Sequence, residues 1–257
     1  MRLHGGYMRV LLTNDDGVHS PGLEAVRAAL QDRHEVWTIA PDSERSAMSH
    51  YITVKNPVSC MHVGERIFAS SGSPADCVII GMLGALPEPP ELVISGINIG
   101  ANLGSDIIYS GTCAAARQAA IMGVPGIALS LDAFEEPLHF DPLARFIREN
   151  LDELVGLWNG EHFINVNAPN SAELEKRIEI TSPSIRIYND KLARFHSPRG
   201  DVYFFMDGGL AETELEPGTD WYAVSHGAIS VSPIYLNPVS HSDSAAYHDA
   251  GFVTSKA

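Results

Sequence analysis

The sequence has few cysteines, few basic residues and no long apolar run, and each shortage argues against a class of protein. Its three cysteines, Cys60, Cys77 and Cys113, are odd in number, widely spaced and without a C-x-x-C pair, so we expect no disulfide framework and a cytoplasmic location. No apolar run approaches the about 18 residues of a membrane span, so we expect no membrane partner. The 17 basic and 32 acidic residues give a formal net charge of −15, which disfavours a nucleic-acid duplex as partner.

What the sequence does contain is a globular composition and a regular alternation of short apolar runs with helical patterns. With 257 residues, 45% of them apolar, the chain can bury a sizeable core in one or two domains. Strands are expected at Arg9–Thr13, Glu35–Ala40, Leu92–Ser95 and Gly126–Ser130, and helices after Ser20 and Ser73, over Thr112–Met122 and over Phe140–Trp158. This order predicts an α/β fold with a doubly wound, mostly parallel sheet and helices on both faces.

The character of the sequence changes near residue 160. Short strands separated by Pro and Gly are expected at Phe163–Asn167, Ile178–Ile187, Val202–Met206 and Ala228–Ser232. We therefore expect a catalytic α/β core over residues 8–160 and a β-rich C-terminal extension over residues 161–257. The extension would pack on the core and on a partner subunit, and it would end in a mobile, Ser- and His-rich tail at Pro238–Ala257.

Two adjacent carboxylates, Asp15 and Asp16, directly follow the first expected strand. Buried and unpaired, they would repel each other, and a hard divalent cation with oxygen ligands would relieve that repulsion. The string from Asn14 to Gly17 is equally typical of a solvated turn, so both interpretations stay open. Asn14 stands where a phosphate-accepting Asp would be needed, and no Asp follows Leu92–Ser95 directly. The pair therefore favours a metal-activated water over an aspartyl-phosphate.

Three further polar clusters lie where such a sheet would bring them together, because ligands bind beyond the carboxyl ends of its strands. Ser95–Gly104 is rich in Gly and Asn, which suit either close approach to an ion or a tight turn. Ser110–Thr112 begins a helix, whose N–H groups can bind phosphate or simply be capped. Asp42–Ser46 is a polar loop in which Ser46 could be a hydroxyl ligand.

Four blocks in fixed order carry a resemblance to a known family. They are T-N-D-D-G at 13–17, A-P-D-S-E-R-S at 40–46, S-G-I-N-I-G-A-N-L-G at 95–104 and Y-S-G-T at 109–112. Further matching segments are G-S-P-A-D-C at 72–77, N-V-N-A-P at 165–169, S-P-R-G at 197–200, G-T-D at 218–220 and H-G-A-I-S-V-S-P at 226–233. These segments resemble the SurE family of stationary-phase survival proteins, which are metal-dependent 5′-nucleotidases. The resemblance extends from about Met8 to Ile234.

The resemblance implies a Rossmann-like core, a C-terminal extension exchanged between subunits of a homodimer or homotetramer, and one divalent cation, Mg²⁺ or Mn²⁺, per subunit. It implies hydrolysis of nucleoside monophosphates by a metal-activated water without a covalent phosphoenzyme. The implied metal ligands are Asp15, Asp16, Ser46 and Asn98, and the implied phosphate contacts are Asn14, Asn98, Ser110, Gly111 and Thr112. Either Asp15 or Asp16 would accept the proton of the water, and the sequence leaves open which.

Two segments depart from the family's usual pattern. After the S-G-T block, Cys113 stands where the family usually has Val, and Gln118-Ala119 stands where it usually has Glu-Gly. The segment Phe204–Gly209 lacks the Trp that is usual there, and this second departure bears on base or leaving-group preference. Two alternatives stay open: a nucleotide- or phosphate-binding module without turnover, and a phosphatase for polyphosphate or another phosphoester. The preferred nucleotide, the metal and the oligomer size are not fixed by the sequence. Because Met1–Tyr7 precede the family's usual start, Met8 is a candidate initiator.

Overall fold

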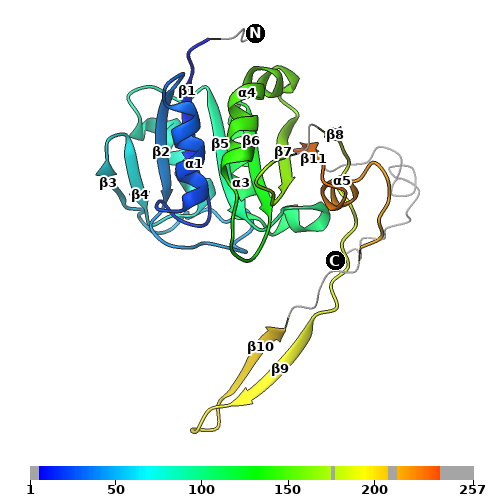
Figure 1. The fold of residues 1–257 in the computed structure, drawn as a ribbon. Helices are drawn as coiled ribbons and strands as arrows, with labels where there is room; N and C mark the ends of the chain where they lie inside the picture. Colours follow the sequence, from blue (N-terminus) through cyan, green and yellow to red (C-terminus); the bar gives the residue numbers. More distant parts are fainter. Residues whose placement is uncertain (1–5, 175–176, 208–212, 238–257) are drawn as a thin grey trace, which may run out of the picture.

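A nine-stranded sheet forms the body of the molecule in the computed structural model, which describes residues 6–174, 177–207 and 213–237 (Figure 1). Its strands are β1 (Arg9–Thr13), β2 (Glu35–Pro41), β3 (Cys60–Gly64), β4 (Ile67–Ser70), β5 (Leu92–Ile99), β6 (Gly126–Asp132), β7 (His162–Pro169), β8 (Ile178–Ile180) and β11 (Ile229–Tyr235). They lie in the order β3-β4-β2-β1-β5-β6-β7-β11-β8, and neighbours from β4 to β7 in this order are parallel. The predicted α/β class with a mostly parallel sheet is confirmed.

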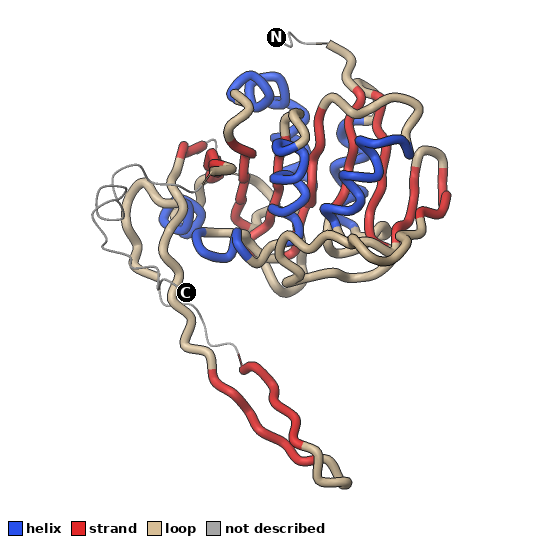
Figure 2. The backbone as a smooth tube through the Cα atoms, turned by 180° about the vertical axis from the view of Figure 1, so that it is seen from behind, coloured by secondary structure: helices blue, strands red, loops and turns tan. Residues whose placement is uncertain are grey.

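Helices cover both faces of the sheet, as predicted (Figures 1 and 2). Helices α1 (Pro21–Leu30) and α4 (Asp141–Leu157) lie on one face, and α2 (Pro74–Ile80) and α3 (Gly111–Ile121) lie on the other. The short helical segments are η1 (Gly81–Ala85), η2 (Gly104–Ile108) and α5 (Asp220–Ser225). No helix among the described residues combines the length and apolar character that a membrane span requires.

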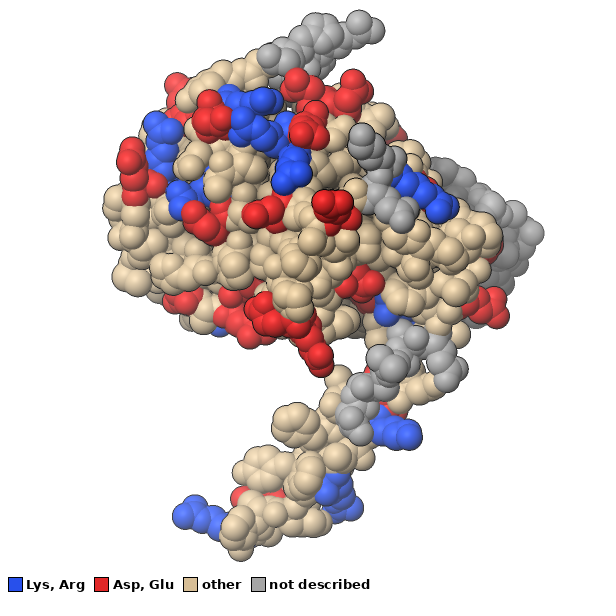
Figure 3. Space-filling model, in the orientation of Figure 1, with Lys and Arg blue, Asp and Glu red and all other residues tan. Residues whose placement is uncertain are grey.

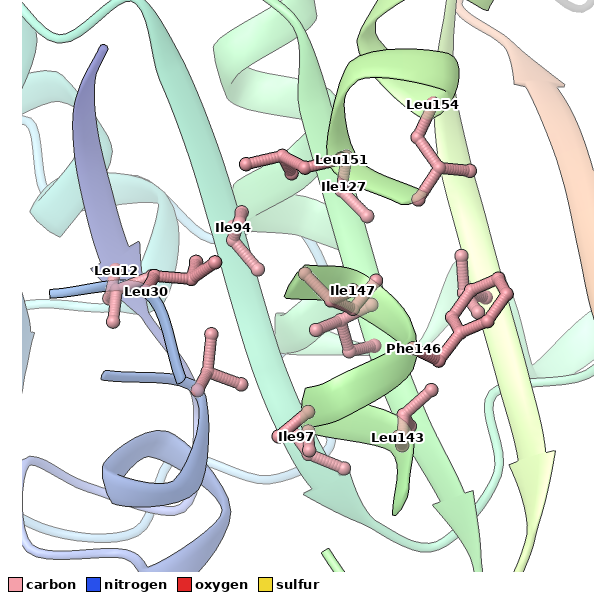
Figure 4. Packing of buried hydrophobic residues seen from close by; sticks show 14 of the residues in the cluster. Leu12, Leu30, Ile94, Ile97, Ile127, Leu143, Phe146, Ile147, Leu151 and Leu154 are labelled. Carbon is pink, nitrogen blue, oxygen red and sulfur yellow. The ribbon is translucent and has the colours of Figure 1, made fainter. Parts of the chain in front are cut away.

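The two faces are built by alternation along the central strands. Leu12 and Ile94 belong to the core under α1 and α4, whereas Leu11 and Val93 belong to the core under α2 and α3. Figure 4 shows Ile147 and other apolar side chains of α4 lying over β5 and β6. The parallel strands are buried on both faces, which fixes the edge of the sheet at which their carboxyl ends meet.

Side-chain caps start the helices where the sequence indicated. The Ser20 hydroxyl accepts the N–H of Leu23 at 3.3 Å, with Pro21 in the first helical position. Ser73 and Asp76 form a reciprocal cap at the predicted start of α2. Ser110 caps α3, which begins at Gly111, one residue before the predicted start.

The chain beyond residue 160 divides between the sheet and a projecting arm. Strands β7 and β11 pair antiparallel within the central sheet, whereas β9 (Lys191–His196) and β10 (Val202–Asp207) form a hairpin that extends away from the body (Figure 1). The boundary predicted between residues 160 and 161 stays a prediction, and the predicted tail at Pro238–Ala257 lies outside the described residues.

One predicted strand in this part of the chain is wrong in its extent. The expected strand over Ile178–Ile187 ends as β8 at Ile180. Pro183 follows shortly afterwards and has no N–H to donate to a ladder, which explains why regular pairing does not continue. The strands β3, β4 and β9 and the helix α5 were not predicted.

Two helical glycines provide a matched test of how closely α1 approaches β5. A Cβ on Gly22 would lie 2.0 Å from the carbonyl oxygen of Ile97, whereas a Cβ on Gly156 would meet nothing within 4 Å. We expect Gly22→Ala to lower the free energy of unfolding by about 1–3 kcal/mol through overpacking. We expect Gly156→Ala to raise it by up to about 1 kcal/mol through helix propensity. Urea denaturation of both variants measures this, and equal effects would contradict the packing described.

Candidate active site

The polar clusters singled out in the sequence meet at the carboxyl edge of the sheet. Asp15 and Asp16 follow β1, Ser46 lies in the loop after β2, and Asn98 lies at the end of β5. A cavity of about 710 Å³ opens beside them, and its lining includes Asp15, Ser46, Asn98 and Ser110. This is where ligands bind in open parallel sheets.

Asp15 is buried and held by the first turn of α3. Its Oδ2 accepts the N–H of Thr112 at 3.2 Å, and its Oδ1 accepts the Thr112 hydroxyl. Burial raises the pKa of Asp15, and the hydrogen bonds from Thr112 oppose that rise. The partial positive charge at the start of α3 therefore stabilises this carboxylate.

The approach of α3 to Asp15 depends on a glycine. A Cβ on Gly111 would lie 2.9 Å from Asp15 Oδ2 and 3.0 Å from Asp15 Cβ. Any larger residue at the first position of α3 would push the helix away from the carboxylate. In this structure the Gly and Thr of the S-G-T block contact Asp15: Gly111 permits the close approach and Thr112 donates the hydrogen bonds.

Asp16 lacks the support that Asp15 has. Its Oδ2 is buried and has no hydrogen-bond partner among the described residues. Burial and then the charge of Asp15 raise the pKa of Asp16 to about 7. An orphaned buried carboxylate oxygen beside a second carboxylate is an arrangement that a divalent cation would satisfy, because such cations prefer oxygen ligands.

Asn98 reaches the site because β5 is irregular. The pairing of β5 with β6 shifts register between Ser95 and Asn98, and Gly96 has a φ of +122°. A Cβ on Gly96 would lie 2.2 Å from the carbonyl oxygen of Leu129, so only glycine fits there. The side-chain N–H of Asn98 donates to the Gly100 carbonyl at 2.7 Å, which leaves Oδ1 available to a cation.

The loop that follows Asn98 is anchored by buried asparagines from β7. The carbonyl oxygen of Asn102 accepts side-chain N–H groups of Asn165 at 2.8 Å and Asn167 at 3.1 Å. The N–H of Asn102 donates to Asn167 Oδ1 at 2.8 Å, and its side chain donates to the Ser130 hydroxyl at 2.7 Å. The N-V-N-A-P motif therefore holds the loop that directly follows Asn98.

Ser46 lies at the cavity on a loop that is tied to β1. The N–H of Arg45 donates to the backbone carbonyl of Asp15 at 2.7 Å, and the Arg45 guanidinium lies 3.2 Å from Asp42. Ser46 itself is exposed and lines the cavity together with Asp15. The structure thus brings the four predicted metal ligands to one edge of the sheet.

The predicted phosphate contacts divide into two groups. Asn98 and Ser110 line the cavity, and the Ser110 hydroxyl also accepts the N–H of Cys113 at 3.0 Å. Asn14 is buried and donates to the Gly17 carbonyl at 2.9 Å and to the Ser20 hydroxyl at 2.7 Å. The N–H and hydroxyl of Thr112 go to Asp15. The phosphate roles of all five residues, Gly111 included, stay predictions.

The rest of the cavity lining includes residues that the sequence analysis did not single out. Asp106 of η2 accepts a hydrogen bond from the Tyr188 hydroxyl and lies 3.2 Å from Arg186 Nε. The Arg186 guanidinium lies 4.9 Å from the centre of the Trp221 ring. These residues come from η2, α5 and an irregular segment, and no local motif marks such a combination.

Acidic side chains dominate this edge of the molecule. They gather along the lower edge of the body in Figure 3, close to the start of the arm. The charged residues that line the cavity are Asp15, Asp106, Asp132 and Arg186. An anionic substrate would meet a negative field here unless a bound cation reversed it.

Fold and site together define an α/β protein with a cluster of acidic and polar side chains at the carboxyl ends of parallel strands. The sequence profile described as "Survival protein SurE" matches residues 10–190. The chain therefore belongs to the SurE family, as its motifs predicted.

Similar proteins cover nearly the whole chain. A protein of Citrifermentans bemidjiense named 5′-nucleotidase SurE is 40% identical over 91% of this chain and 95% of its own length. A protein of Heliobacterium modesticaldum with the same name is 40% identical over 91% of this chain and 89% of its own length. The crystal structure of the SurE protein from Aquifex aeolicus is 33% identical, with a TM-score of 0.82, over 94% of this chain and all of that one.

The pKa of Asp16 predicts how the metal-free protein responds to pH. Folded Asp16 titrates at about pH 7, whereas an unfolded Asp titrates at about pH 4, so ionisation between these values opposes folding. We expect the free energy of unfolding in EDTA to fall as pH rises through this window, and to fall less in Asp16→Asn. Urea denaturation across pH measures both slopes, and identical slopes would contradict the burial of an unpaired Asp16.

Proposed function

We propose that this chain is a metal-dependent 5′-nucleotidase that hydrolyses nucleoside monophosphates. The observation that carries the proposal is the pair Asp15 and Asp16: the buried Oδ2 of Asp16 has no hydrogen-bond partner among the described residues, and Asp15 lines a cavity large enough for a ligand. Curated relatives that cover about nine-tenths of this chain bear the name 5′-nucleotidase SurE, which supports the same activity.

One divalent cation per subunit, Mg²⁺ or Mn²⁺, would be held by Asp15, Asp16, Ser46 and Asn98. These carboxylate, hydroxyl and amide oxygens are the ligand types that both ions accept. When bound, the cation supplies Lewis acidity toward the phosphate and lowers the pKa of a coordinated water.

The two carboxylates have different surroundings, which suggests different roles. Both oxygens of Asp15 accept hydrogen bonds from Thr112, so Asp15 is fixed as a ligand. Asp16 is not held by α3 in this way, and we propose it as the carboxylate that accepts the proton of the attacking water. Asn14 stands in place of a nucleophilic Asp, which supports direct attack by water without a phosphoenzyme.

The phosphate would be bound where the cavity meets the start of α3. Ser110 and Asn98 line this end of the cavity and can contact the phosphoryl oxygens. Gly111 and Thr112 contribute the positive end of the helix, and Asn14 holds the turn that carries the carboxylates. The cytoplasm is the proposed location, which the absence of any disulfide among the three described cysteines supports.

The extension over residues 161–257 would complete a homodimer or homotetramer by exchange between subunits. The arm supports this, because β10 exposes Phe204, Phe205 and Met206, and Phe205 is 73% exposed. A two-stranded ribbon with this much uncovered apolar surface is marginal alone in water. A second copy of the chain is the occupant we propose for it.

Metal-dependent turnover tests the proposed function. We expect the purified protein to release phosphate from AMP with Mn²⁺ or Mg²⁺ and to release none in EDTA. Asp15→Asn is expected to lower kcat at least about a hundredfold, because it removes a charged ligand and disturbs the hydrogen bonds with Thr112. Asp152→Asn, an exposed change on α4, serves as the matched control and is expected to retain activity.

The outcomes separate the functions that the sequence left open. Nucleotide binding without phosphate release in metal-replete buffer would favour the binding module and contradict the nucleotidase. Release from polyphosphate in strong preference to AMP would identify a different phosphoester as the substrate. Full activity of Asp15→Asn would contradict the proposed site.

The oligomer proposal is tested by charging the arm. Phe205→Glu is expected to lower the mass measured by light scattering, because a carboxylate would be buried where two copies meet. Val54→Glu places the same charge on an exposed position of the body and is expected to leave the mass unchanged. A monomeric wild-type protein, or an unchanged mass of Phe205→Glu, would contradict the proposed exchange.

A further inference from the structure

We propose that Asp132 accepts a hydrogen bond from a ribose hydroxyl of the substrate, so that the cavity favours ribonucleotides over nucleotides that lack these hydroxyls. This inference rests on the proposed nucleotidase function and deepens it. Asp132 is the last residue of β6, the strand that pairs with β5 next to Asn98, and it lines the same cavity as Asp15 and Asn98.

The cavity is larger than a phosphate group requires. Its volume of about 710 Å³ lies within the range of sites that enclose a whole small molecule. Three of the metal-ligand candidates and Ser110 make up only part of its lining, and the rest includes Asp106 of η2, Asp132 of β6 and the side chains of Arg186, Tyr188 and Trp221. That remaining lining is available to the nucleoside part of a substrate.

Three carboxylates line this cavity, and two of them already have partners. Asp15 accepts both hydrogen bonds from Thr112, and Asp106 accepts the Tyr188 hydroxyl and pairs with Arg186. The carboxylate of Asp132 accepts no hydrogen bond from any residue that the structure describes. It is therefore the carboxylate at this wall with acceptor capacity to spare.

Asp132 is also partly removed from water, which makes an unpaired acceptor costly. Burial raises the pKa of Asp132, and the charge of Arg186 opposes that rise. An ionised carboxylate only accepts hydrogen bonds, so the group that satisfies it must be a donor. A hydroxyl of a ribose is such a donor, and an acidic residue that binds ribose hydroxyls is a recurrent solution in nucleotide sites of α/β proteins.

Hydrogen bonds and strand pairing hold Asp132 and other parts of the cavity lining in place. Asp220 is fully buried and accepts the N–H of Gly104 at 2.7 Å and the N–H of Ser184 at 2.9 Å, which ties η2 to the segment that carries Arg186. Asp132 itself is paired in the sheet, opposite Pro169 of β7. A preorganised acceptor loses little entropy when it binds a hydroxyl.

The charges argue for a neutral sugar at this wall and against a second phosphate. Arg186 is the cationic side chain of the cavity lining, and it is already paired with Asp106. A second phosphate would therefore meet Asp132 without a free cation to compensate.

Exposed aromatic surface at the cavity, with Phe134 80% exposed, is suited to stack on a base.

The test compares AMP with 2′,3′-dideoxy-AMP as substrates of the Mn²⁺-loaded enzyme. We expect kcat/KM of the wild type to favour AMP by about ten- to hundredfold, which is the effect of one hydrogen bond to a charged acceptor. In Asp132→Ala this ratio should fall to near one, and in Asp132→Asn, which keeps a neutral acceptor, it should be intermediate. The ratio cancels any general loss of turnover, and Asp132→Asn preserves side-chain volume if the alanine variant folds poorly.

Each outcome has a distinct meaning. Asp152→Asn, outside the cavity, should keep the wild-type ratio. A wild-type ratio near one, or a wild-type ratio retained in Asp132→Ala, would overturn the role of Asp132 while leaving the nucleotidase intact. Phosphate release from neither substrate by the wild-type enzyme would overturn the proposed function and this inference together.

Discussion

The repulsion between two carboxylates held out of water at the end of β1 is the constraint on which the rest of the site depends. Asp15 is stabilised by the start of α3, and Gly111 is required for that approach. Asp16 receives no comparable support, and its buried oxygen stays without a partner in the described chain. When Asp16 is ionised, a cation would satisfy this oxygen and relieve the repulsion between the two carboxylates.

The surrounding fold positions the other candidate ligands and the rest of the cavity lining. The register shift in β5 directs Asn98 to the site, and the asparagines of β7 hold the loop beyond it. The chain beyond residue 160 then returns to the cavity with Arg186, which pairs with Asp106, and with Trp221, whose ring lies against Arg186. Residues far beyond the α/β core thus shape the space beside the carboxylates.

Much of this could be predicted from the sequence because it is local. Apolar periodicity and the helix starts after Ser20 and Ser73 indicated the strands and helices of the core. The D-D pair left a cation site and a solvated turn open, and the cation site stays a prediction. The rest of the cavity lining could not be predicted, because Asp106, Asp132 and Arg186 are brought to the same cavity only by the tertiary fold. The use of Thr112 by Asp15 was also hidden, because helix starts that bind phosphate and those that bind a carboxylate have the same sequence pattern.

Calorimetric titration of Mn²⁺ into the metal-free protein tests the central claim most directly. The account predicts one Mn²⁺ per chain for the wild type and a loss of affinity of at least about tenfold in Asp16→Asn, because a charged ligand is removed and the like-charge pair no longer needs the cation. Equal affinity in the two proteins, or no binding by the wild type, would contradict it. The carboxylate pair would then be a structural turn.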